Sequence, residues 1–255
     1  ITSFAATSIT PTTAILHWTA SATNLLLDYG QGAQPVSGGT ATLTSLNPNT
    51  LYTVRLYAGE EEGSACCVAR TSFRTGCGAM AAPMVERFDD LTADEMPPCW
   101  SMGKNFDDAT LFPRVSTVTA LSGSKSLMLS SGDNTTATHF GMVMSPNITT
   151  AIASLTVHVS LRANMNNAKV EIGLCDTVSG LFSLYGFTPV DTLVLPQNGQ
   201  WYEFAVPLTE YSGNGTRLAL RMMQGLQPSG GCIVYIDDLM VENCGVDELW
   251  VNHIG

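Results

Sequence analysis

The chain has 255 residues, and its 11 Lys plus Arg against 22 Asp plus Glu give a formal net charge of −11. This acidic balance repels phosphate backbones and anionic membranes, which argues against nucleic acid as a partner. Hydrophobic residues make up 45% of the chain and charged residues 13%, a composition typical of folded rather than disordered protein. Because no uninterrupted run of about 18 apolar residues occurs, we expect no insertion into a membrane.

Residues 1–77 contain short apolar segments at regular spacing, separated by turn residues. The segments are AILHWTA (14–20), NLLLDYG (24–30), ATLTSL (41–46), TLYTVRLYA (50–58) and VARTSFRT (68–75). Strands at such spacing are typical of a small β-sandwich. Trp18, the stretch LNPNTLYTVRLYA and the final SFRTGC closely resemble a fibronectin type III domain. The resemblance implies a tyrosine corner at Tyr52 and core positions for Trp18 and Leu46.

Small residues and a proline in TGCGAMAAP (75–83) end this pattern, so we expect a linker at 78–82. Residues 83–244 then contain a second series of strand candidates. These are MVERFDD, SLMLSS, HFGMVMS, SLTVHVSLRA, KVEIGLCD, TLVLP, WYEFAVPL, TRLALRMM and CIVYIDDLMVE. So many antiparallel strands in one domain favour a jelly-roll sandwich. The expected fold class is all-β, with an N-terminal fibronectin type III β-sandwich and a C-terminal jelly-roll β-sandwich.

The order of short motifs in residues 83–244 carries a second resemblance. The motifs are ERFDD…PPCW, GSKSLMLSSG, VEIGLCDT, WYEFAVPL and VYIDDLMVENC. In this order they resemble the MAM-like jelly rolls, including the cleaved-adhesin modules of gingipain-type surface proteins from Gram-negative gut and oral anaerobes. Several carbohydrate-binding modules share the topology and the end motifs. The resemblance implies an extracellular or outer-surface location and a glycan or a host surface protein as partner.

In the last residues, 245–255, two apolar residues have the same spacing as two apolar residues at the start of the first domain. FAATSIT places Phe4 and Ile9 five apart, and LWVNHIG places Leu249 and Ile254 five apart. These residues either begin a further module or form an irregular tail, and the sequence leaves both interpretations open. The chain also starts without a methionine, as a fragment of a larger protein would, and we expect this fragment to be monomeric.

Two adjacent acids stand among apolar residues in VYIDDLM, and a regular strand would place one on each face. If the first and last strands of the jelly roll pair, as the resemblance implies, Asp89 faces Asp237. The carbohydrate-binding relatives imply a structural Ca²⁺ held by these two carboxylates and by the carbonyl oxygens of Arg87, Ser122 and Lys125. Relatives often have Glu at this position, and the shorter side chain of Asp89 reaches less far towards an ion. The alternative is that Asp237 hydrogen-bonds a neighbouring turn.

The same implied strand pairing predicts the disulfides. It brings Cys77 towards Cys244 and Cys99 towards Cys232, at the two ends of the strand pair. Cys175, inside VEIGLCD, is expected to be a buried thiol. Disulfides would indicate an oxidising compartment, consistent with export.

Sequence motifs of catalysis are missing. The chain has no G-x-S-x-G, H-E-x-x-H, G-x-x-x-x-G-K-[ST] or G-x-G-x-x-G motif, so we expect no enzyme. Tyr185 and Tyr211 lie beside predicted loops and are the candidates for stacking on a sugar ring. Trp100 and Trp201 match positions that the family buries.

The expected function is therefore a non-catalytic, adhesin-like binding module with a structural calcium. The alternatives are structural spacer modules or an accessory region of a larger secreted hydrolase or protease.

Overall fold

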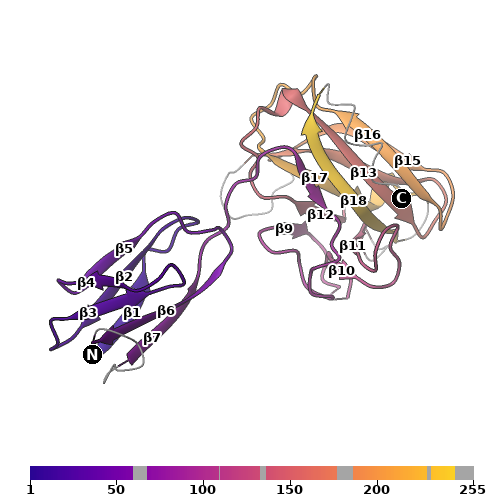
Figure 1. Cartoon of the computed structure of the whole chain (residues 1–255). Coiled ribbons are helices and arrows are strands. Elements are labelled where there is room, and N and C mark those ends of the chain that lie inside the picture. Colours follow the sequence, from indigo (N-terminus) through magenta and orange to yellow (C-terminus); the bar gives the residue numbers. More distant parts are fainter. Residues whose placement is uncertain (60–67, 109, 133–135, 177–185, 229–230, 245–255) are drawn as a thin grey trace. The chain divides into compact units, whose positions relative to one another are not determined.

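The computed structural model describes residues 1–255 except 60–67, 109, 133–135, 177–185, 229–230 and 245–255 (Figure 1). The chain divides into two compact units, Ile1–Gly78 and Ala79–Gly255. The predicted all-β fold class is confirmed, because strands make up nearly all the regular structure of the described residues. The proposed further module at 245–255 lies outside the described residues.

The first unit packs two antiparallel sheets against each other. The three-stranded sheet has the order β1 (Ser3–Thr7), β2 (Ala14–Thr19), β5 (Thr40–Leu43). The four-stranded sheet has the order β4 (Gln34–Val36), β3 (Leu25–Asp28), β6 (Leu51–Ala58), β7 (Val68–Arg74). Alternate residues of β2 are buried, as expected of a strand with one face on the core. Trp18 and Leu46 belong to that core, as predicted.

Neutral hydroxyl groups hold the turn before β6. The backbone N–H of Asn47 donates to the Tyr52 hydroxyl at 2.9 Å, and the Tyr52 ring stacks on Phe73. The Thr75 hydroxyl donates to the carbonyl of Asn47 at 2.6 Å and accepts from the N–H of Thr50 at 2.9 Å. The contact between Asn47 and Tyr52 is the one that a tyrosine corner makes.

The second unit also packs two antiparallel sheets. The six-stranded sheet has the order β10 (Arg114–Ser116), β11 (Ser126–Ser130), β18 (Ile233–Asn243), β13 (Leu155–Ala163), β16 (Trp201–Pro207), with β8 (Met84–Glu86) also paired to β18. The five-stranded sheet has the order β15 (Phe187–Leu195), β14 (Ala168–Cys175), β17 (Arg217–Met223), β12 (Phe140–Met144), β9 (Ser101–Lys104). Two short 3-10 helices, Ile152–Ser154 and Gln224–Leu226, precede β13 and follow β17. One apolar core fills the space between the sheets.

Along one edge, strand β18 pairs first with β11 and then with β8. Residues 233–236 pair with β11, and residues 239–241 pair with β8 (Figure 1). Between these stretches lie Asp237 and Asp238, where the register against β13 shifts and Asp238 has a φ of 43°. We call this pair of residues the β18 bulge. A bulge adds one residue to a strand, so it changes which residues face the core.

The β18 bulge reverses the alternation that the sequence suggests. Val234 and Ile236 are fully buried before the bulge, whereas Leu239 and Val241 are buried after it. The predicted alternation, which ran unbroken through the strand, is therefore wrong in its second half. The predicted register is also wrong by one residue. A pairing of Asp89 with Asp237 would place Arg87 opposite Leu239, but Leu239 pairs with Glu86.

Candidate functional site

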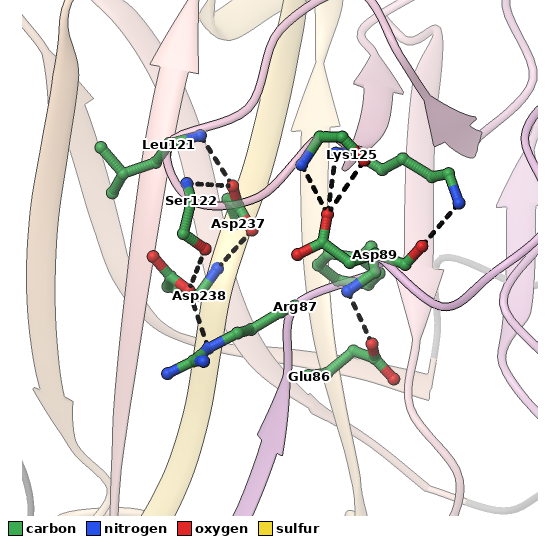
Figure 2. Close-up of polar contacts among 10 residues, drawn as sticks. Glu86, Arg87, Asp89, Leu121, Ser122, Lys125, Asp237 and Asp238 are labelled. Atoms are coloured by element: carbon green, nitrogen blue, oxygen red, sulfur yellow. Dashed lines mark hydrogen bonds and ion pairs between the residues drawn. The ribbon is translucent and has the colours of Figure 1, made fainter. Parts of the chain in front are cut away.

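The loop between β10 and β11, residues 117–125, lies beside the β18 bulge (Figure 2). We call residues 117–125 the clamped loop, because two carboxylates hold its backbone. One belongs to Asp237 in the β18 bulge, and the other belongs to Asp89, which follows β8. The change of neighbour along β18 brings the ends of β8 and β11 together, and the clamped loop lies where they meet.

Asp237 is fully buried and binds the first part of the clamped loop. Its Oδ2 accepts the backbone N–H groups of Leu121 at 2.7 Å and Ser122 at 3.2 Å, and its Oδ1 accepts the N–H of Asp238 at 2.8 Å (Figure 2). A buried carboxylate requires such partners, because a charge without hydrogen bonds is costly inside a protein. The alternative prediction, that Asp237 hydrogen-bonds a neighbouring turn, is confirmed.

Asp89 binds the second part of the clamped loop. Its Oδ1 accepts the backbone N–H groups of Ser124 at 2.6 Å and Lys125 at 3.1 Å (Figure 2). The carboxylate lies directly over Gly123, where an added Cβ would come within 1.9 Å of Oδ2. Gly123 also has a φ of +60°, which favours glycine. A glycine is therefore required here both for backbone conformation and for the close approach of Asp89.

Two side-chain cations complete the contacts. Lys125 Nζ donates to the carbonyl oxygens of Asp89 at 2.5 Å and Leu91 at 2.8 Å. Arg87 Nε lies 3.3 Å from Asp238 Oδ1, and the same oxygen accepts the Ser122 hydroxyl at 2.8 Å. The segment after β8, the clamped loop and β18 are thus joined by charged hydrogen bonds, which are stronger than neutral ones.

Burial disfavours the charged form of the Asp237 carboxyl group. Burial raises the pKa of Asp237 from its ordinary 3.8 to about 6, although the N–H groups of Leu121, Asp238 and Ser122 act in the opposite direction. Burial also raises the pKa of Glu86, the last residue of β8. The desolvation of both carboxylates therefore outweighs the hydrogen bonds that favour their charged forms.

The clamped loop turns apolar side chains towards solvent. Val118 is 75% exposed and Leu121 is 41% exposed. Their backbone is nevertheless held, because Ser126 donates its hydroxyl to the carbonyl of Thr119 and the Arg162 guanidinium donates to the Thr119 hydroxyl. The loop thus combines a fixed backbone with exposed hydrophobic side chains.

The calcium site implied by the resemblance stays a prediction, but the residues named for it do not fit a cation in this arrangement. Ca²⁺ takes six to eight oxygen ligands. The groups of Ser122 and Lys125 that contact the carboxylates are instead N–H groups, which present positive hydrogens. Among the described residues, no group of three or more His, Cys, Asp or Glu is placed to hold a metal ion.

The structure places the five residues predicted for calcium in one region but with other contacts. Asp89 and Asp237 do not face each other across a strand pair, because β8 ends at Glu86 and Phe88 turns the chain with a φ of 63°. Each carboxylate instead binds a different part of the clamped loop. Arg87 takes part through its guanidinium group.

Sequence reasoning missed the roles of Gly123, Leu121 and Asp238 at this site. Gly123 lies between serines in the sequence LSGSKS, a composition typical of a tight turn. That composition marks the turn, whereas nothing in the sequence shows which way its peptide groups point.

The predicted cysteine pairings are wrong. Cys77 and Cys99 are disulfide-bonded, as proposed for each of them, but Cys232 and Cys244 are free thiols. Cys232 lies fully buried in the core of the second unit, whereas Cys244 is exposed at the other end of β18. The pairings depended on a strand register that does not occur. Cys175 is a buried free thiol, as predicted.

Of the two tyrosines proposed for ligand stacking, only Tyr211 lies within the described residues. Its hydroxyl accepts the N–H of Gly215 at 2.6 Å, and its ring packs against the core. Tyr211 thus helps to fold its own loop. Trp100 also packs against the core and makes an edge contact with Phe88, while Trp201 is partly buried in β16.

Solved structures similar to this chain include adhesin domains and carbohydrate-binding modules. The K2 cleaved adhesin domain of Lys-gingipain matches with a TM-score of 0.49 and 16% identity over 63% of this chain and 99% of its own. The K3 domain of Lys-gingipain from Porphyromonas gingivalis W83 matches with a TM-score of 0.46 and 13% identity, over 63% of this chain and 98% of its own.

A family 22 carbohydrate-binding module of Clostridium thermocellum Xyn10B matches with a TM-score of 0.41 and 14% identity over 64% of this chain and 94% of its own. No protein-family model and no curated protein matches the chain. At these identities the likeness concerns the fold. Within the part of the chain that the structure describes, no helix has the length and apolar character needed to span a bilayer.

Proposed function

We propose that the chain is a non-catalytic, extracellular, adhesin-like binding module that contacts a protein partner through the clamped loop. The observation that carries this proposal is the exposure of Val118 and Leu121 on a loop whose backbone is held by the carboxylates of Asp237 and Asp89. Solvent-exposed aliphatic side chains stabilise a fold little, but they become favourable when a partner covers them.

A held loop suits recognition because it loses little conformational entropy on binding. A partner that orders a mobile loop must offset about 0.5–1.5 kcal/mol for each side chain that it immobilises. The backbone of the clamped loop is already fixed by the N–H groups of Leu121, Ser122, Ser124 and Lys125. Binding residues are commonly found on loops that a rigid scaffold positions in this way.

The exposed side chains favour a protein over a glycan as partner. In the described part of the chain, the exposed large hydrophobic residues are Ile9, Leu51, Val68, Val85, Val118, Leu121 and Val194. All are aliphatic, whereas sugar rings stack on aromatic faces. The clamped loop therefore offers a surface that a hydrophobic patch of another protein would cover.

The first unit would act as a fibronectin type III spacer. Its two sheets of three and four strands and the contact of Asn47 with Tyr52 support this assignment. The disulfide-bonded state of Cys77 and Cys99 supports export to an oxidising compartment. The finer MAM-like assignment of the second unit is supported by its six-stranded and five-stranded sheets.

The test is binding of the full chain to a panel of purified extracellular-matrix proteins and to a glycan array. For the matrix protein that binds, Val118→Asp and Leu121→Asp are expected to lower affinity at least about tenfold, because each places a charge in the interface. Val194→Asp is the matched control, since Val194 is 42% exposed on β15 in the other sheet, and it should bind as the wild type does.

The proposal would be contradicted if Val194→Asp lowered the affinity as much as the loop variants do. Unchanged affinity in both Val118→Asp and Leu121→Asp would also contradict it. Glycan binding that is lost in Tyr185→Ala would favour the carbohydrate-binding alternative. Failure to bind any member of either panel would favour the structural spacer.

A further inference from the structure

We propose that the clamp is independent of metal, with the Lys125 ammonium group and the amides of the clamped loop supplying the positive charge that a calcium ion would supply. This inference concerns how the second unit is held together, and it does not depend on the proposed function.

The first support is the number of amides directed at the carboxylates. Asp237 receives two N–H groups from the clamped loop and one from Asp238, at 2.7 to 3.2 Å. Asp89 receives two more, from Ser124 and Lys125, at 2.6 and 3.1 Å. Successive N–H groups in a turn form a concave site for an anion. Here the anions are side chains of the same unit.

The second support is the position of the Lys125 ammonium group. Its Nζ lies 2.5 Å from the carbonyl oxygen of Asp89 and 2.8 Å from that of Leu91. Backbone carbonyl oxygens that converge in this way are typical calcium ligands. Two cations cannot share these oxygens, so an ion could bind them only if Lys125 moved away.

The third support is the balance of charge near the clamp. Asp89, Asp237 and Asp238 contribute three carboxylates, and Arg87 and Lys125 contribute two side-chain cations that contact this region. Hydrogen bonds from backbone amides stabilise the remaining negative charge without a full charge of their own. The clamp therefore needs no divalent ion for electrostatic balance.

The direct test is calcium binding by the wild-type full chain. Isothermal titration with CaCl₂ is expected to give no saturable heat, and thermal unfolding in millimolar EDTA should match that in millimolar CaCl₂. A stoichiometric calcium site, together with a melting temperature that EDTA lowers and calcium but not magnesium restores, would overturn the proposal.

Substitution of Lys125 tests the role of the ammonium group. Lys125→Met keeps the aliphatic stem and removes the charge, so the melting temperature is expected to fall by about 4 °C in EDTA and in calcium alike. Deuterium uptake by the clamped loop should rise at the same time. Lys169→Met is the matched control, because Lys169 lies on β14 in the opposite sheet. A wild-type melting temperature and unchanged exchange in Lys125→Met would contradict the proposed role.

Asp89→Asn provides a second variant that keeps an acceptor oxygen. Since Asn Oδ1 can accept the same N–H groups, the metal-free clamp predicts a smaller loss of stability than in Asp89→Ala, with no effect of calcium in either variant. A calcium site instead predicts that Asp89→Asn abolishes a calcium-dependent stabilisation seen in the wild type. The wild-type titration decides the question even if the variants fold poorly.

Discussion

The two units hold comparable turns with different chemistry. In the first unit, the hydroxyls of Tyr52 and Thr75 bind the backbone of Asn47. In the second unit, the carboxylates of Asp89 and Asp237 bind the backbone of the clamped loop. A neutral hydroxyl keeps its hydrogen bonds over a wide range of pH, whereas a carboxylate responds to protonation. The stability of the held turn is therefore expected to depend on pH in the second unit only.

The largest effect is expected for Asp237→Ala. It leaves the N–H groups of Leu121 and Ser122 without their acceptor at a buried position, and it removes side-chain volume. The expected loss in free energy of unfolding is about 3 kcal/mol. Urea unfolding of the full chain, with hydrogen exchange to assign the change to the second unit, measures it. A loss confined to the first unit would contradict the assignment.

The next largest effect is expected for Gly123→Ala, with a loss of about 2 kcal/mol in free energy of unfolding. The added methyl group would clash with the carboxylate of Asp89 and would have to adopt a φ of +60°. Because Asp89 must move, deuterium uptake should rise at Ser124 and Lys125. Gly38→Ala is the control, since it also has a positive φ of 79° but has nothing within 4 Å of an added Cβ. If both variants lose the same stability, strain alone explains the effect and the contact with Asp89 contributes little.

Tyr52→Phe is expected to cost about 1 kcal/mol, in the first unit only. The variant keeps the stacking on Phe73 and removes the acceptor for the N–H of Asn47. Its effect should be the same at acidic and neutral pH, because the lost group is neutral. A loss of stability that varies with pH would show that the turn in the first unit is coupled to a charged group.

The smallest effect is the pH dependence of the clamp. Because burial raises the pKa of Asp237 to about 6, the folded state binds this proton more tightly than the unfolded state does. The stability from this group is therefore complete at pH values below about 4 and is lost as the pH rises through about 6. Relative to Asp237→Asn, the wild type should gain roughly 1 kcal/mol between about pH 7 and about pH 5. An opposite slope would show that the hydrogen bonds outweigh burial.

The sequence predicted the fold class because alternating and continuous apolar segments mark most strands directly. It missed short strands such as β4, β9 and β10, whose sequences QPV, SMGK and RVS carry almost no apolar pattern. The register of β18 could not be predicted either. The β18 bulge depends on a positive φ at Asp238, and an aspartate gives no sign of that in a run of apolar residues.

At the site, the sequence identified the turn at 122–125 and the two carboxylates Asp89 and Asp237. The calcium hypothesis named carbonyl oxygens of the turn, whereas the groups of Ser122 and Lys125 that contact these carboxylates in the structure are N–H groups. The orientation of a peptide group depends on the φ and ψ angles beside it, and residue types do not determine these angles. The disulfide pairings failed because they required the first strand to pair along the whole of β18, whereas β8 pairs only with residues 239–241 and β11 pairs with residues 233–236.

The free thiols of the second unit can serve as internal reporters of its unfolding. Burial raises the pKa of Cys175 to about 11 and that of Cys232 to about 12, so the reactive thiolate is scarce at neutral pH and reagents cannot reach either sulfur. Cys244 is exposed and should be alkylated in the folded protein. Pulsed alkylation followed by peptide mass spectrometry would then label Cys175 and Cys232 only in molecules whose core has opened. The protein thus carries its own probes, without any introduced cysteine.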